Sequence, residues 1–369
     1  MAKNTKAKQK SIVNSSSLLF LKNYLNNASP TGFESSGQKL WLNYIKPYID
    51  NHFVDPYGTA VGVINPDEKF KVVIEAHADE ISWFVNYITG DGLIYLKRNG
   101  GVDHQIAPGK RVIIHGKKGP VKAVFGWPAI HTRMGGGEKE TQPKVDNLFL
   151  DCGARSKKEV DALGVHIGSV ATYEEGFDEL AYDYYIGRAM DNRIGGFMIA
   201  EVARLLKENK KKVPFGLYIV NAVQEEIGLR GAEMIARRIK PDVAIITDVT
   251  HDTTTPMINK MIEGDIACGK GPSLAFGPAV HNKLLDVVQK VAEDKKIPVQ
   301  LRTVSRSTGT DTESFAYAND GCPSVLISIP LRYMHTTVEM LHKEDIENTI
   351  RLMYETLLTL TPKTKLSYF

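Results

Sequence analysis

The sequence predicts an α/β fold in which a mostly parallel sheet is flanked by helices and interrupted by a small β domain. After residue 186, helical patterns alternate regularly with near-continuous apolar runs, and such runs are typical of parallel strands buried on both faces. From about residue 81 to 175 the pattern changes to short alternating strands broken by Gly and Pro. The change predicts an insert between two halves of one domain.

Apolar periodicity predicts the elements of the larger domain. Two helices open the chain, separated by a Ser-Pro-Thr-Gly turn, and two short strands follow them before the insert. Beyond the insert, helices and strands alternate to the end of the chain. The expected helices are residues 17–26, 34–45, 193–209, 232–238, 283–294 and 344–360, and the expected strands are 60–64, 72–76, 217–223, 243–246, 299–303 and 325–329.

Within the insert, three Gly-bounded stretches read as strands and one short stretch has helical periodicity. The predicted organisation is therefore a discontinuous domain, residues 17–80 and 176–369, that brackets an inserted β domain, residues 81–175. Residues 1–16 carry four lysines among polar residues and are expected to form a basic flexible tail.

Composition excludes several classes of protein. The 369 residues are 43% hydrophobic, and 46 basic against 43 acidic residues leave a net charge of only +3, so neither nucleic acid nor an anionic membrane is an expected partner. Lys22 interrupts the first apolar stretch, which is too short for a signal peptide or a membrane span. The three cysteines contain no CxxC pair and suggest neither a disulfide framework nor a thiolate zinc site. A cytoplasmic location is expected.

Acidic and histidine residues follow the strand-like runs of the larger domain. Two imidazoles and three carboxylates, with one further glutamate beside them, match what a two-metal hydrolase needs to hold two divalent ions roughly 3.5–4 Å apart around one activated water. The candidate metal ligands are His77, Asp191, Glu226, Asp248 and His335, and the additional glutamate is Glu225.

Each of these residues also has an ordinary structural explanation. His77 could be a loop histidine bonded to a local carboxylate, Asp191 a helix N-cap, and Asp248 a turn residue. The glutamate pair could lie exposed before a helix, and His335 could be a satisfied structural histidine. Their common position after strands favours the metal site. Asp79, two residues beyond His77, can accept its second N–H and fix the tautomer that faces a metal.

Seven phrases within residues 23–360 form an ordered set. They are Asp-Pro-Tyr-Gly at 55–58, Ala-His-Ala-Asp-Glu-Ile at 76–81, Gly-Arg-Ala-Met-Asp-Asn-Arg at 187–193, Val-Gln-Glu-Glu-Ile-Gly-Leu-Arg-Gly-Ala at 223–232, Asp-Val-Thr-His at 248–251, Gly-Thr-Asp at 309–311 and Ile-Pro-Leu-Arg-Tyr-Met-His at 329–335. Together they resemble the glutamyl aminopeptidase family, whose members are dinuclear metallo-aminopeptidases that form tetrahedral dodecamers, some of them labelled endoglucanases.

The resemblance implies a zinc-peptidase-like catalytic domain and a function. The chain would be a metal-dependent aminopeptidase acting on oligopeptides, with two ions per subunit, Zn²⁺ or alternatively Co²⁺ or Mn²⁺. His77 and Asp248 would bind one ion, Glu226 and His335 the other, and Asp191 both. Asp79 would orient His77.

Further expectations come from the same resemblance. Glu225 would act as the general base. The insert would be a barrel-like dimerisation domain within a homo-oligomer, and the peptide bond after Asp191 would be cis. The chain departs from the family pattern at Ala76, Ala78, Ser82 and Thr336-Thr337. These departures put in doubt which substrate side chain the pocket prefers.

Two other classes of function remain as alternatives. An endoglucanase-type glycoside hydrolase needs only a carboxylate pair, which leaves both histidines and the third carboxylate without a role. A non-catalytic assembly protein would require a blocked pocket, although every expected ligand and the base are present.

Overall fold

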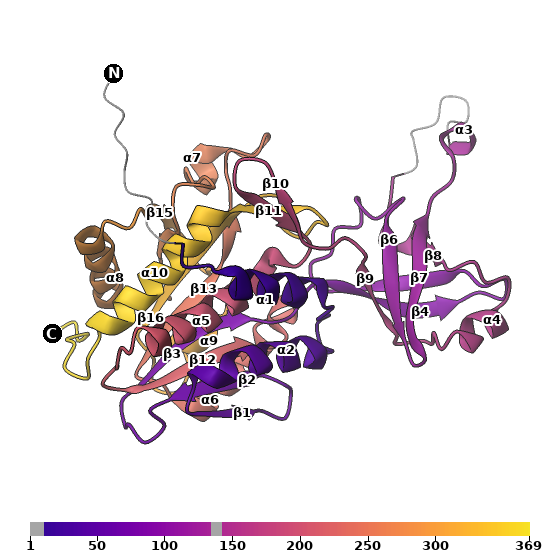
Figure 1. Ribbon diagram of the computed structural model, residues 1–369. Coiled ribbons are helices and arrows are strands. Elements are labelled where there is room, and N and C mark those ends of the chain that lie inside the picture. The colour runs from indigo at the N-terminus through magenta and orange to yellow at the C-terminus, as the bar shows by residue number, and fades with distance from the viewer. Residues whose placement is uncertain (1–10, 134–141) are drawn as a thin grey trace.

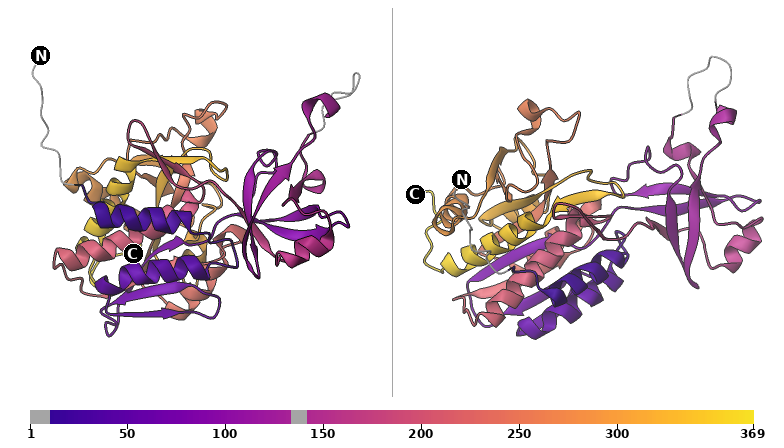
Figure 2. Two further views of the ribbon diagram at one scale, coloured as in Figure 1. Left: turned by 45° about the vertical axis from the view of Figure 1, so that its right-hand side comes forward. Right: turned by 45° about the horizontal axis from the view of Figure 1, so that its top comes forward.

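The computed structural model describes residues 11–133 and 142–369. A helix-covered sheet forms the larger lobe, and a β-barrel projects from one side of it (Figures 1 and 2). The predicted α/β class with an inserted barrel is confirmed. No helix in the described ranges is long and apolar enough to cross a membrane.

The main sheet has eight strands, and its four central strands run parallel to one another. Antiparallel pairings flank this centre on both sides. In sheet order the strands are β1 (Asn51–Val54), β2 (Ala60–Ile64), β12 (Gly216–Ala222), β3 (Lys71–His77), β13 (Val243–His251), β16 (Ser324–Leu331), β14 (Ser273–Phe276) and β15 (Gln300–Thr303).

Helices cover both faces of this sheet. One layer centres on α5 (Met190–Glu208), beside which lie α1 (Ser15–Asn26), α2 (Ser35–Ile45) and α10 (Lys343–Thr359) (Figure 1). The other face carries α6 (Arg230–Ile239) and α9 (Thr312–Ala316), and α8 (Asn282–Lys295) packs against α10 and β16. The remaining short elements of this lobe are η1 (Lys46–Tyr48), η3 (Glu225–Ile227) and α7 (Lys260–Glu263).

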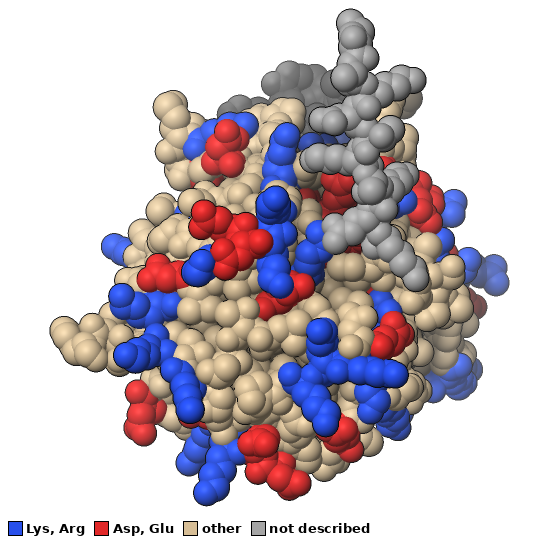
Figure 3. All heavy atoms as spheres, turned by 60° about the vertical axis from the view of Figure 1, so that its left-hand side comes forward, with Lys and Arg blue, Asp and Glu red and all other residues tan. Residues whose placement is uncertain are grey.

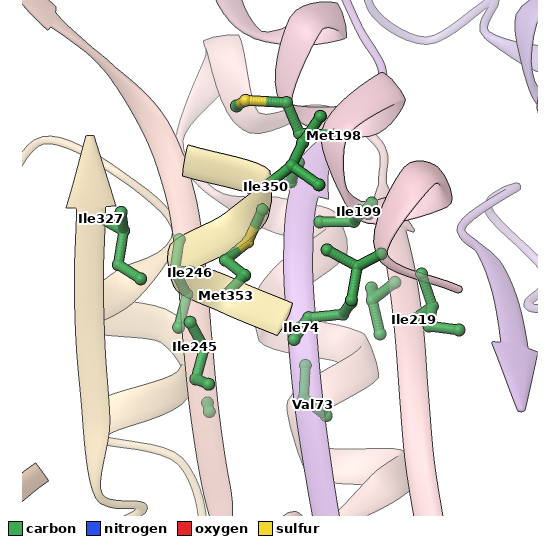
Figure 4. Packing of buried hydrophobic residues seen from close by; sticks show 14 of the residues in the cluster. Val73, Ile74, Met198, Ile199, Ile219, Ile245, Ile246, Ile327, Ile350 and Met353 are labelled. Carbon is green, nitrogen blue, oxygen red and sulfur yellow. The ribbon is translucent and has the colours of Figure 1, made fainter. Parts of the chain in front are cut away.

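The core of the larger lobe forms where α5 and α10 press apolar side chains onto the parallel strands. Figure 4 shows Ile74 of β3 and Ile246 of β13 packed beside Ile350 and Met353 of α10. Gly196 lets α5 approach the sheet closely, because a Cβ there would lie 2.6 Å from Asn221 Oδ1. The Trp41 indole donates to the carbonyl of Gly196 at 2.8 Å and fixes α2 against α5.

Six antiparallel strands close the barrel, which lies within the predicted insert. It has its own apolar core, separate from that of the larger lobe, in which Trp83 and Phe125 pack edge to face with ring centroids 5.3 Å apart. Around the barrel the strands are β4 (Ser82–Ile88), β5 (Ile94–Asn99), β8 (Phe149–Asp151), β7 (Gly119–Gly126), β6 (Arg111–Gly116) and β9 (Val170–Tyr173), accompanied by α3 (Ile130–Arg133), η2 (Val145–Asn147) and α4 (Lys157–Ala162).

A small sheet joins the end of the insert to the C-terminal part of the chain. In it β11 (Tyr184–Gly187) pairs with both β10 (Asp178–Leu180) and β17 (Glu339–His342). None of these three strands was predicted from the sequence. They bring the segment before α5 beside the segment after β16.

The predicted helices and strands of the larger lobe all occur, with most ends within two residues of expectation. Two boundaries differ in an informative way. Strand β13 continues to His251 instead of ending at Ile246, because Asp248 and the residues after it pair with β16. Helix α1 begins at Ser15, since the Asn14 side chain accepts from the backbone N–H groups of Ser16 and Ser17.

The predicted tail, residues 1–16, lies mostly outside the described ranges. On the face of the larger lobe that looks away from the barrel, acidic and basic side chains are interspersed (Figure 3). This distribution forms no extended field of one sign on that face.

Candidate metal centre

The carboxyl ends of the parallel strands bring four of the predicted site segments together. His77 is the last residue of β3, and Glu225 and Glu226 form the turn η3 directly after β12. Asp248 lies inside β13, where it is in register with Ser328, and His335 follows β16. Parallel strands end at one edge of the sheet, so their loops converge there.

Asp191 lies between the two histidines. Its Oδ1 is 3.1 Å from His77 Nε2, and its Oδ2 is 3.3 Å from His335 Nε2. Asp191 is in the first turn of α5, where its ψ of 110° is not helical, and the peptide bond to Asn192 is cis, as the resemblance implies. Both carboxylate oxygens therefore face an imidazole nitrogen.

The other three carboxylates surround the same point. His77 Nε2 is 3.8 Å from Glu225 Oε2 and 3.9 Å from Asp248 Oδ1. His335 Nε2 is 3.4 Å from Glu226 Oε2. Two groups with metal-ligand spacing result, His77 with Glu225 and Asp248, and His77 with Asp191 and Glu226.

Asp79 is buried behind this cluster and connects two of its segments. Its Oδ1 lies 3.4 Å from His77 Nδ1 and accepts from the backbone N–H of Glu225 at 3.0 Å. Its Oδ2 accepts from the Glu226 N–H at 3.2 Å and from the Thr31 hydroxyl at 2.9 Å. One carboxylate thus contacts the His77 imidazole and holds the turn that carries both glutamates.

A loop of the barrel reaches His335. The Nδ1 atom of His335 lies 3.1 Å from the carbonyl oxygen of Gly101, which favours a proton on Nδ1 and directs Nε2 toward Asp191 and Glu226. The approach is close, since a Cβ on Gly101 would lie 2.7 Å from His335 Nδ1. The inserted β segment therefore contributes to the geometry of the site.

The buried carboxyl and imidazole groups of the cluster shift one another's pKa values. Burial raises the pKa of Glu225 to about 10 and that of Asp248 to about 7, against the opposing effect of His77. Burial also opposes protonation of His335, yet contacts with Asp191 and Glu226 raise its pKa to about 11. For Asp191, burial is outweighed by hydrogen bonds to both imidazoles, which lower its pKa.

These features fit divalent metal ions. Within the described residues, none of the four clustered carboxylates forms an ion pair with Lys or Arg, and Glu226 Oε1 is buried without a hydrogen-bond partner. Imidazole and carboxylate groups are the donors that Zn²⁺ and related ions prefer. Bound cations would favour the ionised form of these buried carboxyl groups.

Several residues that support the site were not anticipated from the sequence. Glu339 accepts from the backbone N–H groups of Asp191 and His335, and Glu34 accepts from that of Gln224 at 3.3 Å. Glu75 lies near Asp311 of the Gly-Thr-Asp phrase, and both carboxyl groups are buried. Burial raises the pKa of Glu75 to about 8 and that of Asp311 well above its usual range. Glu75 had a detectable signal, a charged residue inside an apolar strand.

The site opens into a cavity of about 490 Å³. Its lining includes the clustered carboxylates and histidines together with Leu229, Thr250, Arg302 and Met334. The cavity is large enough for an amino-acid side chain together with the adjoining peptide bond.

The fold and the cluster define a metal-dependent hydrolase. A family model described as M42 glutamyl aminopeptidase matches residues 58–352. The chain belongs to the M42 glutamyl aminopeptidase family, a family of metal-dependent aminopeptidases.

Individual relatives agree with this assignment. The chain is 31% identical to the lysyl aminopeptidase of Pyrococcus furiosus, over 93% of this chain and 97% of the relative. Its structure resembles a TET aminopeptidase from a marine sediment archaeon of the Thaumarchaeota, with a TM-score of 0.90 and 30% identity over 95% and 98% of the two chains. It also resembles the TET1 peptidase of Pyrococcus horikoshii, with a TM-score of 0.81 and 25% identity over 92% and 98%.

Proposed function

We propose that this chain releases N-terminal amino acids from oligopeptides with the help of two divalent metal ions. The observation that carries the proposal is the position of Asp191, whose two carboxylate oxygens face the Nε2 atoms of His77 and His335. A carboxylate with one oxygen toward each of two imidazoles is suited to bridge a pair of ions.

The resemblance and the donor chemistry support one assignment of ligands. His77 and Asp248 would hold one ion, Glu226 and His335 the other, and Asp191 both. Zn²⁺ suits this mixed imidazole and carboxylate set, and Co²⁺ or Mn²⁺ are alternatives. When bound, such ions lower the pKa of a shared water and polarise the scissile carbonyl.

The chain's own groups would move the proton. We assign the general base to Glu225, which lines the cavity and whose Oε2 lies 3.8 Å from His77 Nε2. Its carboxylate would take a proton from the attacking water and deliver it to the leaving amine. Asp79, through its contact with His77 Nδ1, would keep Nε2 directed at the ligands.

The ligand set favours an exopeptidase over an endopeptidase. The free amine of a peptide would lie near one ion and the adjacent carboxylates, which would align the first peptide bond with the base. Internal peptide bonds have no such free amine.

The assembly forms a second part of the proposal. The Pyrococcus horikoshii relative is described as able to assemble into a tetrahedron or a large octahedral shell. We expect this chain to form a homo-oligomer through its barrel, with dimers building a dodecamer, so that only short or unfolded peptides reach the sites. Three free thiols fit a reducing cytoplasm.

The test is hydrolysis of a set of aminoacyl nitroanilides by the purified protein, before and after chelation and after return of Zn²⁺, Co²⁺ or Mn²⁺. We expect release of nitroaniline that chelation abolishes and one of these ions restores. Blocking the substrate's amino group should abolish hydrolysis. Activity on a β-glucan that survives chelation would overturn the proposal in favour of a glycosidase, and inactivity of the fully loaded protein would favour an assembly role.

A further inference from the structure

Four lysines line a cavity at the edge of the main sheet opposite to the metal centre. The cavity has a volume of about 430 Å³, a size suited to a small molecule, and lies between the C-terminal end of α5, the segment that leads into β12 and the end of β2. Asp191 is in the first turn of α5, so the metal centre is about 24 Å from Lys207 along the helix axis. The lysines are Lys207, Lys210, Lys211 and Lys212.

The four lysines make no ion pair within the described residues. Glu208, in the same run, pairs with Arg204 at 2.5 Å. Lysines that follow a helix often satisfy its last carbonyl groups, but in α5 the carbonyls of Leu205 and Leu206 already accept from backbone N–H groups of the next segment. All four side chains are exposed, so their ammonium groups are available to an anion.

The rest of the lining combines an apolar surface with one carboxylate. Tyr48 is half-buried, and its ring packs edge to face against that of Tyr44, with centroids 5.9 Å apart, which holds it in place. Asp50 is held by the backbone N–H of Asn65, which donates to its Oδ2 at 2.9 Å. A carboxylate can accept hydrogen bonds from the hydroxyls of a ribose. The apolar residues of the lining are Tyr48, Ile64, Leu206 and Val213.

Charge and shape together select a class of ligand. Four lysines and one aspartate give the lining a net charge of +3, which is complementary to a chain of phosphates. A fatty acid carries a single negative charge and would leave most of the lysines unpaired. An inorganic anion would leave the apolar surface unused. A nucleoside polyphosphate uses every feature, because its base can stack on an aromatic ring, its ribose carries hydroxyls and its phosphates are multiply charged.

We propose that this cavity binds a nucleoside polyphosphate, with the phosphates against the lysines and the base against Tyr48. The ribose hydroxyls would lie toward Asp50. Because the lysines are exposed, salt should weaken the binding. The inference concerns a second site, goes beyond the proposed peptidase function and does not depend on it.

The test is calorimetric titration of the metal-loaded protein with ATP in the presence of Mg²⁺. We expect saturable binding. Lys211→Met combined with Lys212→Met should weaken it by at least about 10-fold, which corresponds to the loss of one charge-assisted hydrogen bond or more. Lys157→Met combined with Lys158→Met removes an adjacent exposed pair from α4. This matched control should bind ATP like the wild type.

Tyr48→Leu tests the place of the base. The substitution removes the flat ring but keeps an apolar side chain. ATP should therefore bind about 5–100-fold more weakly, the range of base–aromatic stacking, whereas inorganic triphosphate should bind as it does to the wild type. Metal content and circular dichroism of each variant check that the metal centre and the fold are intact.

Three results would overturn the inference. The first is a wild-type protein that does not bind ATP. The second is ATP binding that the substitutions of Lys211 and Lys212 leave unchanged, because the nucleotide would then lie elsewhere, as at the ions of the metal centre. The third is inorganic triphosphate that binds as tightly as ATP, which would make the cavity a site for simple anions.

Discussion

Glu339 Oε2 accepts a hydrogen bond from the backbone N–H of Asp191 at 3.1 Å. The other oxygen of the same carboxylate accepts from the N–H of His335 at 2.7 Å. Glu339 is buried at the start of β17 and thereby fixes the main chain at two candidate ligands that come from different elements. Each of the two backbone N–H groups therefore has its own carboxylate oxygen as acceptor.

Glu339→Gln should lower metal affinity. An amide offers one oxygen acceptor, and its NH₂ group would face one of the two backbone N–H donors and leave it unsatisfied. Loss of such an outer partner typically reduces metal affinity about 10–100-fold. Metal titration of the apoprotein measures this. Glu293→Gln, on the exposed side of α8, should bind metal like the wild type; equal affinity in both variants would contradict the clamping role.

Substitutions of the adjacent residues Glu225 and Glu226 should distinguish the general base from the metal ligand. Glu225→Gln removes the proton acceptor but keeps the shape, so we expect both ions and the fold to be retained while kcat falls by about 10²–10⁴-fold. Glu226→Gln should instead lose bound metal, because a neutral amide is a poor ligand for Zn²⁺. Metal stoichiometry and kcat decide between them. The reverse pattern would show that the two roles are interchanged.

Gly101→Ala should disturb the metal centre from within the barrel. The new Cβ would lie 2.7 Å from His335 Nδ1, so the imidazole must move away from its contact with the Gly101 carbonyl. We expect weaker metal binding and reduced activity with little loss of secondary structure. Gly90→Ala is the control, since a Cβ there meets no atom within 4 Å. Normal metal affinity in Gly101→Ala would show that His335 tolerates the displacement.

Asp252→Asn should destabilise the fold at neutral pH but not in acid. Burial opposes ionisation, yet hydrogen bonds from Thr254, Cys268 and Arg332 lower the pKa of Asp252 to about 2. A lowered pKa stabilises the fold above the unfolded value near 4, and the contribution disappears as the pH falls toward 2.

The expected loss in this variant is about 2 kcal/mol at pH 7, from the difference between the folded and unfolded pKa. Urea unfolding at several pH values measures it. Asp265→Asn removes an exposed ion pair with Lys260 and should change stability by less than about 1 kcal/mol at any pH. If the free energies of unfolding of Asp252→Asn and wild type differ by the same amount down to about pH 2.5, the ionised carboxylate is not the source of the difference.

Replacing residues 81–175 by a short linker should leave a smaller assembly in solution. The expectation follows from the barrel's separate apolar core and from its projection away from the larger lobe. Sedimentation velocity compares the two proteins. An unchanged oligomer would assign the subunit contacts to the larger lobe. Loss of activity alone is not informative, because Gly101 is removed with the barrel.

Elements with strong local periodicity were predictable from the sequence. Helices such as α5 and α10 bury continuous apolar stripes, and central strands such as β3 are buried almost throughout. The small sheet of β10, β11 and β17 was missed because its strands have three or four residues, and β10 is exposed throughout. The pairing of β11 with β17, as between Tyr184 and His342, joins residues about 160 positions apart, which no local pattern encodes.

The candidate metal ligands could be predicted from the sequence for a related reason. His77, Glu226 and His335 follow or end apolar strands, so the chemistry could be placed at one sheet edge. Asp248 was assigned to a strand end, whereas β13 continues through it, because its pairing with β16 extends beyond the apolar run. Glu339 and Arg302 could not be assigned to the site, since only the tertiary contacts bring them there.

The distribution of the site along the chain has a consequence for biosynthesis. His77 emerges early, whereas His335 lies about 260 positions later, and the sheet needs β16 before the parallel strands carrying the site are complete. At typical elongation rates of about 5–20 residues per second, roughly 13–50 s separate the two histidines. A nascent chain therefore carries an unfinished cluster of acidic groups throughout most of its synthesis. Peptidase activity would arise only near the end of translation, when the C-terminal segment joins the sheet.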